Sequence, residues 1–210
     1  ALATQNPATA TDMYNTAVGY DAGQEITTGI QNTLIGGLAG DALTDADYNV
    51  AVGLNALSTD TLGSRNTAVG TNALATQNFT TATDAYNVAV GTNAGISVTT
   101  GTSNTIVGGL AGDALTTGSN NVAIGLSALS ADDVGSRSVA VGSNALESQN
   151  TATAANVYNT AVGYGVGAAV TTGVQNTLVG GLAGDALTTG QQNTVLGYSA
   201  LTADTTGIGS

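Results

Sequence analysis

The sequence contains no cysteine, no histidine, no tryptophan and no lysine, and only one proline among its 210 residues. Without cysteine or histidine, neither a Ser–His nor a Cys–His catalytic pair can form. A zinc site with the usual ligands is excluded for the same reason. Paired carboxylates are therefore the enzymatic chemistry that remains to be considered.

Basic residues are almost missing. Arg65 and Arg137 stand against fourteen Asp and Glu residues, and the formal net charge is −12. Nucleic-acid binding needs clustered Lys and Arg, and an anionic membrane surface attracts the same residues, so we expect neither partner. The sequence contains no long apolar run, so we expect no membrane insertion. The first residue is not Met and no signal peptide is visible, so we expect any targeting segment to lie outside this stretch.

The charged fraction of 8% is about a third of that of an ordinary globular domain, and aromatic residues make up only 4%. The apolar content is mostly Ala and Val, and Gly, Thr and Asn are abundant. This composition is too apolar for a disordered chain, and it is typical of thin, closely stacked layers.

A motif of the form Asn-(Thr/Val)-x-(Val/Ile/Leu)-Gly recurs along the whole chain. The spacing of successive motifs is 17, 17, 17 and 21 residues, and this cycle then repeats with a period of 72. The string GGLAGDALT occurs at 36–44, 108–116 and 180–188 with the same period. The motifs begin at Asn15, Asn32, Asn49, Asn66, Asn87, Asn104, Asn121, Ser138, Asn159, Asn176 and Asn193.

This regularity predicts an all-β fold, a parallel β-solenoid or β-roll of about eleven 17-residue coils in which every fourth coil has 21 residues. Coils with two glycine corners leave no stretch long enough for a helix. With strands about 4.8 Å apart, eleven coils make a rod roughly 50 Å long. We expect residues 1–210 to form one elongated array, cut from or part of a longer fibre, with superrepeats 15–86, 87–158 and 159–210, the last partial.

The columns of the repeat predict which way each residue faces. The fourth position is always a branched aliphatic residue, so we expect it to face the core, together with the second position. The third position, mostly Ala, should then face outward, against a neighbouring chain. The eighth position, Ala in ten coils, predicts a second inward segment. The fifth position predicts a corner with positive φ, because it is glycine in all eleven coils: Gly19, Gly36, Gly53, Gly70, Gly91, Gly108, Gly125, Gly142, Gly163, Gly180 and Gly197.

The asparagine column has two interpretations. In the first, stacked amides form a structural ladder and hydrogen-bond from coil to coil. In the second, they form a row of ligand contacts. We favour the ladder, since a ligand site rarely needs ten copies. A second glycine column predicts the return corner: Gly29, Gly63, Gly101, Gly118, Gly135, Gly173, Gly190 and Gly207.

The long coils predict outward bulges over 75–86, 147–158 and, in part, 3–14. Each bulge ends in a tyrosine: Tyr14, Tyr86 or Tyr158. The bulges could be decoration, with the tyrosine packed on the next coil, or adhesive loops on a rigid scaffold. The candidate adhesive residues are Phe79, Asp84, Tyr86, Asn156 and Tyr158.

Carboxylates offer the other candidate chemistry. Asp132 with Asp133, or Asp41 with Asp45 and Asp47, could in principle form a glycoside-hydrolase pair. The doublet is not repeated, because Thr61 occupies the place of Asp133, and regular coils predict no cleft; we therefore expect no enzymatic activity. GGLAGD differs from the calcium-binding GGxGxD repeat in its spacing. We expect no metal and no cofactor. Asp60 and Asp132 precede Arg65 and Arg137 by five residues, which predicts surface ion pairs.

The strings NTAVGYDAG, NVAVGLNAL, NTAVGTNAL and SVAVGSNAL resemble the head repeats of trimeric autotransporter (YadA-like) adhesins. They resemble even more closely the NTAxGxxAL repeats of phage tail-fibre proteins. The resemblance covers all eleven coils, although the 17-residue step is longer than that of the adhesin heads. It implies a homotrimeric extracellular fibre, on a virion tail or a cell surface, that mediates attachment to a host cell through a receptor or glycan.

Three functions follow as hypotheses. The leading one is a structural and adhesive segment of such a fibre. The second is a self-assembling extracellular filament whose subunits stack end to end, because neither end of the sequence resembles a capping repeat. The third is ice binding, since flat Thr columns on a solenoid can order water. The column is interrupted by Val50, Val88, Val122 and Val139, which weakens this third hypothesis.

Overall fold

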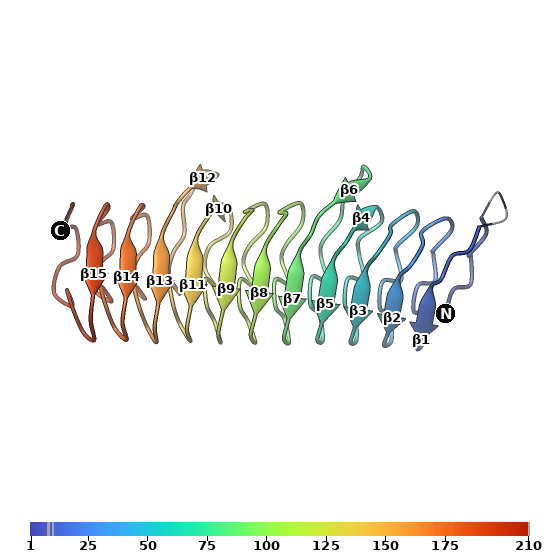
Figure 1. Ribbon diagram of the computed structural model, residues 1–210, viewed down its shortest axis with the longest axis horizontal. Helices are drawn as coiled ribbons and strands as arrows, with labels where there is room; N and C mark the ends of the chain where they lie inside the picture. The colour runs from blue at the N-terminus through green and yellow to red at the C-terminus, as the bar shows by residue number, and fades with distance from the viewer. Residues whose placement is uncertain (8, 10, 210) are drawn as a thin grey trace.

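The computed structural model describes residues 1–7, 9 and 11–209. Parallel strands stack side by side along one rod, about 17 residues apart in the chain and with about eleven turns (Figure 1). The described residues contain no helix. The prediction of an all-β parallel solenoid is therefore confirmed.

Eleven three-residue strands form one sheet in chain order, β1-β2-β3-β5-β7-β8-β9-β11-β13-β14-β15. The other four strands form two-stranded ladders, β4–β6 and β10–β12. The bounds of the sheet strands are Thr16–Val18 (β1), Thr33–Ile35 (β2), Val50–Val52 (β3), Thr67–Val69 (β5), Val88–Val90 (β7), Thr105–Val107 (β8), Val122–Ile124 (β9), Val139–Val141 (β11), Thr160–Val162 (β13), Thr177–Val179 (β14) and Thr194–Leu196 (β15). Those of the short ladders are Gly63–Ser64 (β4), Thr83–Asp84 (β6), Gly135–Ser136 (β10) and Ala155–Asn156 (β12).

Each coil stacks on the next with equivalent residues opposite one another. Thr33 pairs with Val50, and the same column continues across the first bulge, where Thr67 pairs with Val88. The extra residues of that coil are displaced outward, so the loops beside β6 and β12 project from one edge of the rod (Figure 1). Of the N-terminal stretch 3–14, residues 8 and 10 lie outside the described residues.

The predicted facing of the strand residues is wrong. The middle residue of every sheet strand from β2 to β15 is buried, whereas the second and fourth positions of the motif lie on the outer face. Val18 is 59% exposed and Leu196 is 78% exposed. The strict alternation was predicted correctly, but its direction is reversed. The branched aliphatic columns face outward, and the mostly alanine column faces the interior.

The reason is the width of the interior, where large and small side chains compensate one another. In the third coil Leu57 fills the space at the ninth position, and the strand contributes only Ala51. In the second coil the ninth position is Gly40, and Leu34 and Leu43 fill the same space. A Cβ on Gly40 would lie 2.8 Å from a methyl carbon of each leucine. Two branched residues per strand would therefore overfill the coil. The inward direction predicted for the eighth position is confirmed, since Ala22 and nine of its ten equivalents are buried.

The corner glycines adopt φ between +128° and +143°, a conformation that L side chains rarely adopt. Each one from Gly19 to Gly180 also stacks directly on the corner of the next coil. A Cβ on Gly108 would overlap the carbonyl group of Gly125. The corner thus requires glycine for two independent reasons, its φ angle and its contact with the neighbouring coil.

Candidate functional site

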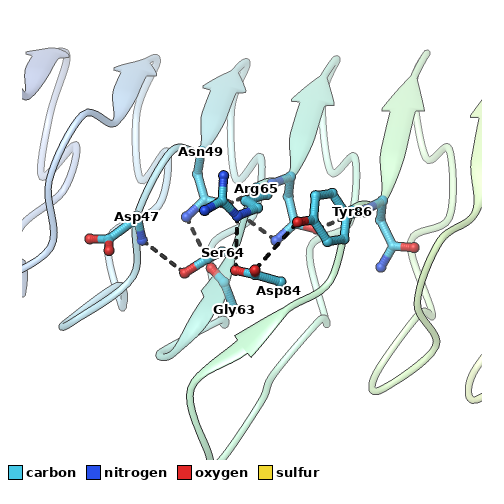
Figure 2. A network of polar contacts seen from close by, with 9 residues as sticks. Asp47, Asn49, Gly63, Ser64, Arg65, Asp84 and Tyr86 are labelled. Carbon is cyan, nitrogen blue, oxygen red and sulfur yellow. Dashed lines mark hydrogen bonds and ion pairs between the residues drawn. The ribbon is translucent and has the colours of Figure 1, made fainter.

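The edge of the rod that carries the bulges is supported from inside by the asparagine column. The Asn49 amide nitrogen donates to the carbonyl oxygen of Gly63 at 3.0 Å, and its Oδ1 accepts from the backbone N–H of Asn66 at 2.9 Å (Figure 2). The same two bonds recur along the rod, for example from Asn104 to Gly118 and from Asn121 to Asn104. Nine of these asparagines are at most 1% exposed. Because they are buried, they cannot form a row of ligand contacts.

A buried polar network holds the base of the first bulge. Asp60 accepts from the Gln77 side chain at 2.6 Å and from the backbone N–H groups of Gly63 and Phe79 at 3.0 and 3.1 Å. Gln77 in turn accepts from the Asn87 amide at 2.8 Å. Asp60, Gln77 and Asn87 are fully buried. In six other coils the twelfth position is aliphatic, so the network replaces apolar core between the enlarged coil and the coil before it.

The second bulge repeats this anchor 72 residues later. Asp132 accepts from Gln149 at 2.5 Å and from Gly135 at 3.0 Å. Gln149 accepts from Asn159 and donates to Ser138, which occupies the ladder position of its coil. Burial raises the pKa of the Asp132 carboxyl group, and its hydrogen bonds with Gln149 and Gly135 oppose that shift.

Two expectations about these residues are wrong. Phe79 is only 6% exposed, because its ring packs over Gly63 at the base of the bulge, so it is not available as an adhesive residue. Asp60 forms no surface ion pair with Arg65, because its carboxylate points inward to the bulge anchor. The partner of Arg65 comes from the bulge itself.

On the outer side of the first bulge, Arg65 lies between two aromatic rings and a carboxylate. Its Nε is 3.0 Å from Asp84 Oδ1, and its guanidinium carbon is 4.6 Å from the ring centre of Tyr48 and 5.8 Å from that of Tyr86. The Tyr86 hydroxyl donates to Asp84 at 3.4 Å (Figure 2). The hydrogen bond with Asp84 raises the pKa of Arg65. An ion pair this exposed contributes little to stability.

The second bulge presents a different surface. Arg137 donates to the Tyr158 hydroxyl at 3.0 Å and lies 5.7 Å from its ring centre. Asn156 stands in the place of Asp84, and Asn120 in the place of Tyr48. The second Arg therefore lacks the equivalent carboxylate and one of the two rings. The scaffold is repeated, but the exposed groups differ in charge and in aromatic area.

The carboxylates do not form the pairs considered from the sequence. Asp132 is buried beneath Gln149, while Asp45 accepts from the Thr28 hydroxyl and Asp47 from the Ile30 N–H. Among the described residues, no group of three or more His, Cys, Asp or Glu side chains could hold a metal ion. The GGLAGD carboxylates Asp41 and Asp113 lie four coils apart, and desolvation raises the pKa of both.

No helix of the described residues is long and apolar enough to cross a membrane. Comparison with family models, with curated proteins and with solved structures finds no match in any of the three. The exposed clusters on the bulges are thus characterised by their geometry alone.

Proposed function

We propose that this chain is a structural and adhesive segment of an extracellular fibre, in which three copies associate and the exposed edges attach to a host cell or surface. The observation that carries the proposal is the outer face of the eleven-stranded sheet. It runs along the whole rod and is formed only by Thr, Val, Ile and Leu.

This outer face is unusual for an isolated chain. Its fourth-position column is aliphatic in every coil, and neither column contains a charged residue. Val18, Ile35, Ile124, Val162 and Leu196 are all exposed. Over eleven strands the face is roughly 50 Å long, and an apolar patch this continuous marks an interaction surface. A second and a third copy of the same rod offer a face of matching length and spacing, and the resemblance to trimeric fibre repeats supports that number.

Charged substitutions in the middle of this face should separate the copies. We expect the unsubstituted chain to have the mass of three chains by light scattering, 3 × 20.3 kDa or about 61 kDa. Val90→Lys combined with Val107→Lys should reduce this to the mass of one chain, because two ammonium groups would be buried at each interface. The control is Thr100→Lys with Thr117→Lys, which places the same charges at exposed positions on the same two coils, away from the strands.

A monomeric unsubstituted chain would overturn the trimer. Electron microscopy separates the fibre segment from the alternative of end-to-end assembly: discrete short rods support the segment, and filaments of indefinite length support the self-assembling filament.

The orientation of the strands gives ice binding a specific observation in its favour. The second-position column, which is Thr in seven of the eleven coils, lies on the outer face and not in the core. Flat, regularly spaced hydroxyl and methyl groups are the surface that this activity needs. A thermal-hysteresis measurement tests it directly, and freezing without hysteresis would remove this second candidate.

A further inference from the structure

An open groove lies on the wall of the rod that follows the main strands, over the coils that begin at Ser138, Asn159 and Asn176. Its volume is about 400 Å³. The polar side chains that line it are Asn144, Glu147, Ser148, Tyr164 and Asp185. It includes Glu147 and Ser148 at the start of the second bulge, but it is separate from the exposed Arg–Tyr clusters, which lie at the residues that precede each ladder position.

The groove exists because one coil has unusually small side chains on this wall. Gly165, Ala168 and Ala169 form its floor. One superrepeat earlier, the equivalent residues are Asn93, Ile96 and Ser97, and two superrepeats earlier they are Asp21, Gln24 and Glu25. The coil that begins at Asn159 therefore lacks the side chains that fill this space in its two equivalents.

Carboxylates stand on both sides of this floor. Glu147 and Asp185 occupy the same position in coils on either side of Ala168, so their backbones are separated by two strand spacings, ~9.6 Å. In the preceding superrepeat the place of Glu147 is taken by Ala75. Asp185 Oδ1 is buried and has no hydrogen-bond partner, and the same is true of Oδ1 in its equivalents Asp41 and Asp113. The unpartnered oxygen is therefore a feature of the repeat, and what distinguishes this groove is that Glu147 faces Asp185 across a floor of small residues.

Tyr164 and Leu182 supply the apolar part of the groove. Tyr164 is 65% exposed, so its ring is open to contact from solvent. A ring beside two carboxylates, an amide and a hydroxyl suits a ligand with one apolar face and several hydroxyl donors, which is the chemistry of a pyranose sugar. Arg65 and Arg137 lie outside the lining, and the net charge of −12 repels anions.

We infer that this groove binds one neutral hexose or hexosamine unit of a surface glycan. The sugar packs against Tyr164 and donates hydroxyl or amine hydrogens to Glu147 and Asp185. Sialylated and other acidic sugars are rejected by the two carboxylates. The inference deepens the attachment role and rests on it.

The test is an array of immobilised neutral, amino and sialylated oligosaccharides probed with the purified chain, followed by calorimetry with the sugar that is retained most strongly. We expect retention on neutral or amino sugars and none on sialylated ones. Ala168→Ile, which introduces the residue found at Ile96, should raise the Kd at least about tenfold by filling the floor. Glu147→Ala, which introduces the residue found at Ala75, should do the same by removing an acceptor.

The matched control is Ala75→Ile, the same change at the same coil position outside the groove, and it should leave the Kd unchanged. Retention of sialylated sugars, absence of any retained neutral or amino sugar, or an unchanged Kd in both groove variants would overturn the inference. Light scattering on the same samples keeps the two proposals apart. If the chain is trimeric but binds no sugar, the groove is not a sugar site, and the proposal of a fibre segment is unaffected.

Discussion

Gln77→Leu should lower the free energy of unfolding by about 3 kcal/mol, because it leaves the buried Asp60 carboxylate without its side-chain donor. It also removes the acceptor that Gln77 offers to Asn87. The loss is not one of apolar volume, since Leu43 and Leu115 occupy the equivalent position in regular coils. Chemical denaturation measures the change, and hydrogen exchange should show lost protection centred on the first bulge.

The control for this variant is Gln175→Leu, which makes the same substitution at an exposed position and should change stability by no more than about 0.5 kcal/mol. Asp60→Leu combined with Gln77→Leu should be less destabilising than the sum of the single variants, because no buried carboxylate then remains. If Gln77→Leu is as mild as the control, the polar anchor does not hold the bulge.

Gly108→Ala should be strongly destabilising, as alanine should be at the other corners in the middle of the rod. It places an L residue at φ +135°, which costs on the order of 1–3 kcal/mol, and directs a Cβ into the carbonyl group of the next coil. We expect a total loss above about 3 kcal/mol, because the stacked backbone cannot move aside without breaking the sheet ladder. Thermal and denaturant unfolding measure the loss.

The neighbouring residue provides the control. At Gly109 the φ angle is not positive, and the nearest atom to an added Cβ is a leucine methyl carbon 3.6 Å away. Gly109→Ala should therefore be nearly neutral or slightly stabilising. Equal effects of the two substitutions on stability would show that the corner tolerates a side chain. Close stacking of the coils would then not be the reason that glycine is required there.

The repeat spacing was sufficient to predict the solenoid, the position of the corners and the place of the bulges. The facing of the strands was not predictable from the same pattern, because alternation shows which residues share a face and not which face is inside. The expectation that branched residues mark the core fails here, since Ala51 and its equivalents fit a narrow interior and Val50 and Val52 do not. The ninth position of the motif also carries information about which face is inside. Leu57 stands there in a coil whose strand supplies only Ala51 to the interior.

The bulge anchor left a signal that sequence reasoning missed. The twelfth position changes from aliphatic to Asp or Gln only in the coils next to a bulge, at Asp60 and Gln77 and again at Asp132 and Gln149, apart from the Asp204 coil. A polar pair in an otherwise apolar column indicates a local change of core. The partner of Arg65 could not be found in this way, because Asp84 reaches it from a loop whose path depends on the fold. The groove at Ala168 was also hidden, since it depends on what small residues leave empty.

The stacking of the coils also determines how the rod responds to force. The strands run across the long axis, so the hydrogen bonds between coils, such as those from Val50 to Asn66, point along it. Tension along the axis therefore loads one coil's bonds at a time, and the chain peels from an end. Each detached coil releases 17 residues, about 58 Å of extended chain at ~3.4 Å per residue, in place of a 4.8 Å layer. A single rod is thus an extensible tether that lengthens in steps of about 50 Å, and association of several rods along the sheet face would stiffen it, because a coil could not peel without leaving its neighbours.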